Sequence, residues 1–282
     1  MPNKAQLPFL LKLLDDDSSS IRESVLKELD AFGPDLELEL AHQKIVLGPD
    51  DQRVMKGILE GHRATWLRDV WPGWFAVEDD KERLEKALSI LAQFMHGRTY
   101  HVSLHQLLDT LAERYVAEDG RNDARRLAHF LFETLAIQGA LQEDYYNPFN
   151  SSLIHVIEQK RGIPISLACV YILIGSRLGL KVEGINLPGH FLAKCVSGGR
   201  AYAVDCYNGG HFLNNDDLAG VQTRPPITMQ DVLSLECQSP PIIARVLRNI
   251  VNAYQQSGQE GNAHLMSELL TMMEHSNLST SA

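Results

Sequence analysis

Apolar positions recur every three or four residues through roughly the first half of the chain, and this spacing predicts helices. Leucines between residues 7 and 14 follow this spacing. A second apolar face begins after Ser20, which forms with Glu23 the S-x-x-E pattern of a capping box. We therefore expect a helical hairpin over residues 1–35, and further helices over residues 36–142.

The pattern changes near residue 143. Residues 145–150, YYNPFN, are typical of a loop. A punctuated turn, Gly162-Ile163-Pro164, then opens the almost continuously apolar run 165–178, which predicts a helix buried on most sides. Gly198-Gly199 separates two short β-favouring runs and predicts a hairpin. The β-favouring runs are residues 181–186, 191–196 and 201–206.

Helical spacing returns after Pro225-Pro226, where two apolar faces are separated by Gly258. The sequence therefore predicts an α+β fold that is mostly α. A helical N-terminal region precedes a small antiparallel sheet, and a helical hairpin follows the sheet. The regions that we expect are residues 1–35, 36–142, 143–224 and 225–282.

Composition narrows the class of function. The chain has 282 residues, a net charge of −10 and 44% hydrophobic residues, which is typical of a soluble globular protein. An acidic balance argues against a nucleic-acid or anionic-lipid partner. No apolar run reaches the roughly 18 residues that span a bilayer. The four cysteines are spread singly, with no metal-binding spacing, so we expect free thiols in a cytoplasmic protein.

One pair of residues suggests chemistry. A buried helix followed by an antiparallel sheet can serve a cysteine nucleophile, because the helix N-terminus stabilises the thiolate and the strands supply a His and an Asp. His190 begins one predicted strand and Asp205 ends the next. The Gly198-Gly199 turn would bring these two side chains together.

Five segments, taken in order, resemble the SirB family of the transglutaminase-like superfamily. The resemblance implies a transglutaminase-like, cysteine-proteinase-like core over residues 143–224. The first 35 residues are similar to one HEAT repeat, and the C-terminal hairpin is similar to one tetratricopeptide unit. The segments that carry the resemblance are NPFNSSL at 147–153, RGIPISL at 161–167, RLGL at 177–180, LPGHFL at 187–192 and VDCYNGGHFL at 204–213.

The resemblance implies that His190 and Asp205 match the family's catalytic His and Asp, but the nucleophile is missing. Active members carry a cysteine in a G-x-C turn, and this chain has Pro164 there. Ser166 should point about 200° away from residue 164 and is better placed to cap the helix. Cys169 lies inside the apolar run, where burial should leave its thiol inert. Both remain poor candidate nucleophiles.

Three roles stay open for the His190–Asp205 pair: a buried structural contact, a binding role and catalysis. A metal site is the weaker alternative, because no third metal-ligating residue stands at a spacing that is typical of such sites. His101 and His105 should share a helix face, which we interpret as solvated. The candidate binding residues are Asn150, Ser152, Pro164, Phe191 and Asn208.

The sequence therefore predicts a cytoplasmic pseudoenzyme that binds a protein or peptide partner, with no cofactor and no metal. Helical hairpins at both ends of the chain are of a kind that presents grooves to such partners. The alternative is a hydrolase or acyl-transfer enzyme that uses His190 and Asp205 with an unusual nucleophile. The sequence does not fix the oligomeric state.

Overall fold

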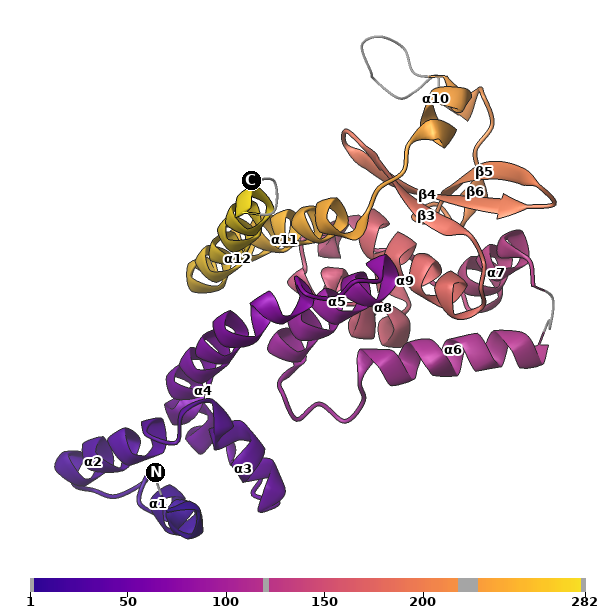
Figure 1. Cartoon of the computed structure of the whole chain (residues 1–282). Helices are drawn as coiled ribbons and strands as arrows, with labels where there is room; N and C mark the ends of the chain where they lie inside the picture. Colours follow the sequence, from indigo (N-terminus) through magenta and orange to yellow (C-terminus); the bar gives the residue numbers. More distant parts are fainter. Residues whose placement is uncertain (1–2, 119–121, 218–227, 280–282) are drawn as a thin grey trace. The chain divides into compact units, whose positions relative to one another are not determined.

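The computed structural model describes residues 3–118, 122–217 and 228–279 (Figure 1). The chain divides into two compact units. The N-terminal unit comprises Met1–Pro72 and Gln93–His101, and the C-terminal unit comprises Gly73–Ala92 and Val102–Ala282.

The N-terminal unit is helical, as predicted. Ser18 is the N-cap of the second helix, and its N–H is bonded to Oδ1 of Asp16. The expected capping box at Ser20 and Glu23 is therefore wrong, because Ser20 already lies inside the first helical turn. Buried leucines and Met55 form the core of the unit. The helices are α1 (Leu7–Lys12), α2 (Ser19–Asp30), α3 (Leu36–His42) and α4 (Pro49–Val70).

Helices α5, α6 and α7 follow along the chain. Helix α5 runs from one unit into the other, and α7 continues into a π-helical turn, Phe130–Thr134. His101 precedes the first residue of α6, so the expectation that it shares a helix face with His105 is wrong. The helices are α5 (Asp80–His96), α6 (Leu104–Glu118) and α7 (Ala124–His129).

Helix α9 (Pro164–Arg177) is the buried helix that the apolar run predicted. Its residues 165–175 are all buried, and Gly179 ends it with a φ of +66°. The short helix α8 (Leu153–Gln159) packs against α9. A two-stranded parallel pair, β1 (Gln138–Gly139) and β2 (Arg161–Gly162), leads into α9 and was not predicted from the sequence.

The sheet is antiparallel and packs its first two strands against α9 (Figure 1). Gly175 near the end of α9 touches Val182 at the start of β3. Strand β3 therefore runs back along α9, so Leu187 and its cross-strand partner His190 lie toward the beginning of the helix. Gly198 and Gly199 form the predicted hairpin turn. The strands, in order, are β3 (Val182–Leu187), β4 (His190–Ser197), β5 (Arg200–Asp205) and β6 (His211–Phe212).

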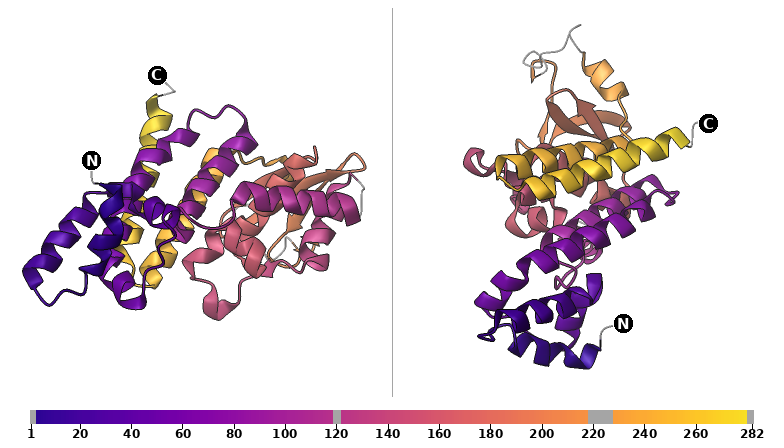
Figure 2. Two further views of the ribbon diagram at one scale, coloured as in Figure 1. Left: turned by 90° about the horizontal axis from the view of Figure 1, so that it is seen from below. Right: turned by 90° about the vertical axis from the view of Figure 1, so that its left-hand side faces the viewer.

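The predicted C-terminal helical hairpin is confirmed. Helix α11 (Ser239–Gln256) and α12 (Glu260–Ser279) pack side by side, and Gly258 lies in the turn between them (Figure 2). Helix α10 (Met229–Ser234) precedes them. The expected boundary at residues 224–225 and the Pro225-Pro226 break lie outside the described residues.

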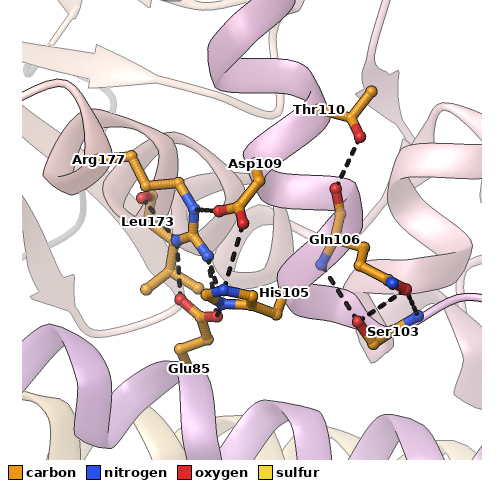
Figure 3. A network of polar contacts seen from close by, with 8 residues as sticks. All are labelled: Glu85, Ser103, His105, Gln106, Asp109, Thr110, Leu173 and Arg177. Carbon is orange, nitrogen blue, oxygen red and sulfur yellow. Dashed lines mark hydrogen bonds and ion pairs between the residues drawn. The ribbon is translucent and has the colours of Figure 1, made fainter.

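An ion-pair network holds the end of α9 to α5 and α6 (Figure 3). The Arg177 guanidinium donates to both carboxylate oxygens of Glu85, at 2.7 and 2.9 Å, and to Oδ1 of Asp109 at 2.6 Å. His105 Nδ1 lies 2.7 Å from the same Glu85 Oε1 that Nη2 of Arg177 contacts, and 3.1 Å from that Nη2. Both Arg177 and Glu85 are only 16% exposed, so this pairing is well shielded from water.

None of the helices in the described ranges is long and apolar enough to cross a bilayer.

Candidate functional site

The imidazole of His190 and the carboxylate of Asp205 are hydrogen-bonded at one end of the sheet. The distance from His190 Nε2 to Asp205 Oδ2 is 3.0 Å. The His190 side chain is 30% exposed, whereas that of Asp205 is 7% exposed. The buried carboxylate therefore fixes the ring, and the other edge of the ring can meet a molecule from outside.

The turn after β5 holds the carboxylate of Asp205. Its Oδ1 accepts the backbone N–H groups of Tyr207 and Asn208, both at 3.1 Å. Its Oδ2 also accepts the Asn208 side-chain amide at 2.8 Å. Burial alone would raise the pKa of Asp205, but the hydrogen bonds from His190 and Asn208 outweigh it and lower that pKa. Asp205 is therefore an ionised orienting group at neutral pH.

Hydrogen bonds connect this turn to the beginning of α9. The Tyr207 hydroxyl donates to the carbonyl oxygen of Ala140 at 2.8 Å, and the Ala140 N–H donates to the carbonyl oxygen of Gly162 at 2.8 Å. Pro164 follows as the first residue of α9, half-buried. Its ring fits the first turn of a helix, but it offers no group that could attack a substrate.

The two alternative nucleophiles are poorly placed for attack. Ser166 is fully buried; its Oγ accepts the Ile163 N–H at 3.1 Å and lies 2.7 Å from the Asn150 carbonyl oxygen. The predicted capping role of its hydroxyl is thereby confirmed. Cys169 is also fully buried, and burial raises the pKa of its thiol far above the ordinary value. Neither group has the exposure that attack on a substrate requires.

The remaining predicted site residues separate into two sets. Pro164 and Asn208 reach the surface. Asn150, Ser152 and Phe191 are buried, with exposed fractions of 0%, 3% and 0%. Their part in binding stays a prediction.

A small hollow of about 250 Å³ lies beside the turn that holds Asp205. Its wall includes Arg161, Tyr207 and Gly139. A side chain at residue 139 would not fit, because its Cβ would lie 2.6 Å from the Tyr207 ring. The residues lining the hollow are Gln138, Gly139, Ala140, Arg161, Tyr207 and Gly209.

The structure adds two residues that the sequence did not indicate. Arg245 of α11 donates to the carbonyl oxygens of Leu187 at 2.8 Å and of His190 at 3.2 Å. Tyr145 packs edge-on against Tyr207, with ring centroids 6.3 Å apart. Arg245 lies 55 residues beyond His190 in a helical segment, so no local motif pointed to it.

The described residues contain no group of three or more His, Cys, Asp or Glu side chains arranged to hold a metal ion.

Comparison with known proteins places this architecture in a family. A family model described as the transglutaminase-like superfamily matches residues 98–248, which is more than half of the chain. The chain belongs to the transglutaminase-like superfamily. The match covers α9, the whole sheet and both members of the His190–Asp205 pair.

Three relatives show how far the likeness to this transglutaminase-like protein extends. A UPF0162 protein of Xylella fastidiosa (strain 9a5c) is 31% identical over 170 residues, which are 54% of this chain and 59% of that protein. A UPF0162 protein of Pseudomonas aeruginosa is 25% identical over 186 residues, 62% of this chain and 66% of that protein. F-box only protein 21 of Pongo abelii is 34% identical over 80 residues, 28% of this chain and 13% of that protein. The chain thus spans less than two thirds of the Xylella relative. No solved structure matches.

Proposed function

We propose that this transglutaminase-like protein is a non-catalytic, cytoplasmic member of the SirB family that binds a protein or peptide partner and acts as a regulator. The observation that carries the proposal is Pro164 at the first position of α9. A helix N-terminus lowers the pKa of a thiol, but an imino acid there has no thiol. Cys169, Cys195, Cys206 and Cys237 are all buried.

The state of the His190–Asp205 pair supports a binding role. An oriented and partly exposed imidazole can donate to or accept from a peptide group without a nucleophile beside it.

Selection from an acetylated random octapeptide pool tests the proposal. The wild-type chain should enrich a defined set of sequences, and His190→Ala should weaken binding of the enriched peptides about tenfold, as expected for the loss of a well-oriented hydrogen bond. His264→Ala is the matched control, because that histidine is exposed on α12, where it pairs with Glu268. If no sequence is enriched over a blank matrix, the binding function fails.

The alternative, an enzyme with an unusual nucleophile, is favoured by the intact His190–Asp205 geometry. Iodoacetamide and a fluorophosphonate test it directly. Selective labelling of Cys169 or Ser166 that disappears in His190→Ala would establish the enzyme and overturn the binding proposal. The buried positions of both groups lead us to expect no such labelling.

A purely structural role for the pair is the third outcome. In that case Asp205→Ala and His190→Ala would lower the thermal unfolding midpoint without changing the affinity for the enriched peptides. Measuring both quantities on the same preparations separates this outcome from a binding role.

A further inference from the structure

Arg245 is held rigidly beside the His190–Asp205 pair. Its Nη1 donates to the carbonyl oxygens of Leu187 and His190, and to the side-chain oxygen of Asn186. Its guanidinium also lies over the Phe191 ring, 5.5 Å from the ring centroid. These contacts use one nitrogen and one face of the group, and they fix its position at the junction of β3 and β4.

The rest of this guanidinium has no protein partner in the described part of the chain. No carboxylate in that part lies within 4.0 Å of Arg245, and its Nε and Nη2 donate to none of the described residues. Arg177 provides the contrast, because Glu85 and Asp109 together engage all three of its nitrogens. Burial lowers the pKa of Arg245, whereas the pKa of Arg177 is raised by its carboxylates despite burial.

The unengaged edge of a guanidinium, formed by Nε and Nη2, has the geometry that grips a carboxylate through two parallel hydrogen bonds. A half-buried arginine gains most from such a partner, because water screens the pair less than at the surface. Arg245 therefore has an unused site for one planar anion.

Aromatic rings adjoin this site. Tyr145 is half-buried, and its ring centroid lies 5.4 Å from that of Tyr146, which is 49% exposed. The positive charge of Arg245 opposes the rise that burial causes in the pKa of Tyr145, so the two groups are electrostatic neighbours. An apolar side chain next to a carboxylate would find tyrosine surface to cover it.

We propose, resting on the binding function above, that Arg245 anchors a carboxylate of the bound peptide, with His190 meeting the adjacent peptide group. The carboxylate is either the C-terminal one or that of an Asp or Glu side chain. A phosphate is the poorer match. It carries up to two negative charges, and Arg245 contacts the backbone of His190, whose ring is bonded to the ionised Asp205, so a second negative charge would be repelled there.

The test uses two acetylated octapeptide pools, one with free C-terminal carboxylates and one with C-terminal amides. Peptides enriched by the wild-type chain are synthesised in both forms, and each is titrated against wild type, Arg245→Gln and Arg245→Lys. Arg248→Gln is the matched control, because Arg248 lies three residues further on the same helix and is exposed.

For a C-terminal anchor, the amide form should bind wild type about tenfold or more weakly than the acid, and Arg245→Gln should bind both forms alike. Arg245→Lys should lose most of the preference, since an ammonium cannot make the bidentate contact. For a side-chain anchor, the enriched sequences should share an Asp or Glu. Replacing that residue of the peptide with Asn or Gln should weaken binding to wild type about tenfold or more and leave binding to Arg245→Gln unchanged. If all variants bind the amide or neutral form of the peptide with equal affinity, the site has stayed folded in each of them.

Two results overturn the inference and leave the binding function standing. One is enrichment of peptides whose affinity is the same with and without the carboxylate. The other is a carboxylate preference that persists in Arg245→Gln or falls equally in Arg248→Gln. Inorganic phosphate that displaces the peptides at lower concentration than acetate would also contradict the choice of anion. Absence of any enriched peptide instead defeats the binding function itself.

Discussion

Replacing Pro164 with cysteine tests whether α9 begins where a nucleophile would act. The substitution places a thiol at the first position of a 14-residue helix, on a half-buried site. An ordinary cysteine has a pKa of about 8.5, whereas thiols at helix N-termini or beside a histidine fall to roughly 3.5–7.5. We expect the new thiol to titrate at about pH 7 or below. That shift corresponds to about 2 kcal/mol, the upper range for a charge at a helix terminus.

The rate of alkylation at one pH is a weak readout of that shift. Lowering the pKa from about 8.5 to about 7 raises the thiolate fraction at neutral pH roughly 15-fold. The same change makes the thiolate about fivefold less nucleophilic, so the net gain is only about threefold. The midpoint of the pH–rate profile with iodoacetamide reports the pKa directly. The wild-type chain supplies the background, because its four cysteines are buried.

A second variant separates the helix from the histidine. Combining Pro164→Cys with His190→Ala should raise the midpoint, because an imidazolium close to the thiolate stabilises it. Pro164→Ser controls for the loss of the proline ring and should label like wild type. A midpoint at the ordinary thiol value, or one that does not respond to His190→Ala, would refute the placement of Pro164 in the nucleophile position.

Three further predictions concern the framework of the site. Arg177→Gln leaves the poorly exposed Glu85 carboxylate without its cation, so the C-terminal unit should lose about 2–3 kcal/mol of stability; a fall of its calorimetric midpoint by less than about 2 °C would contradict this. Burial raises the pKa of Glu85, but its hydrogen bonds from Arg177 and His105 leave it lowered. The stability that this lowered pKa contributes is present above the ordinary value of 4.5 and is lost as pH falls through the folded value. As the pH is lowered below 4.5, the denaturant concentration at the unfolding midpoint of wild type should therefore decrease. The decrease should be smaller in Arg177→Gln. Gly162→Ala should destabilise by about 1–3 kcal/mol, because its Cβ would lie 2.7 Å from the Ser166 Oγ, whereas Gly261→Ala, with open space around it, should not; equal unfolding midpoints would count against the packing at residue 162.

The sequence predicted an element correctly where a single short segment contains the whole pattern that specifies it. The uninterrupted apolar run identified α9, and Gly198-Gly199 identified the hairpin that brings His190 and Asp205 together. Two local predictions failed because of where a helix begins. Ser18 is the N-cap residue of α2, so Ser20 already lies inside that helix, and His101 lies before α6 begins.

The residues that surround the His190–Asp205 pair could not be predicted from the sequence. Arg245 comes from a helix whose own pattern shows only an amphipathic face, and its contacts are with backbone carbonyl oxygens that carry no sequence signal. The parallel pair β1–β2 has strands of two residues, too short for an alternating pattern. Periodicity reports which face of an element is buried, but it does not report which distant element covers that face.

The hydrogen bonds of Asp205 determine how the His190–Asp205 pair should be interpreted. Asp205 accepts hydrogen bonds from two backbone N–H groups and one side-chain amide of its own turn, besides its contact with His190. Removing that carboxylate would leave buried donors unsatisfied, which is costly even in a chain that has no chemistry to perform. The carboxylate can therefore persist for the sake of the turn alone. Within the described ranges, the hydrogen bond that the His190 side chain makes is the one to Asp205, and its ring is partly exposed, so its structural contribution is smaller than that of the carboxylate. The partly exposed histidine, rather than the buried carboxylate, is the member of the pair whose replacement distinguishes a working site from a structural remnant.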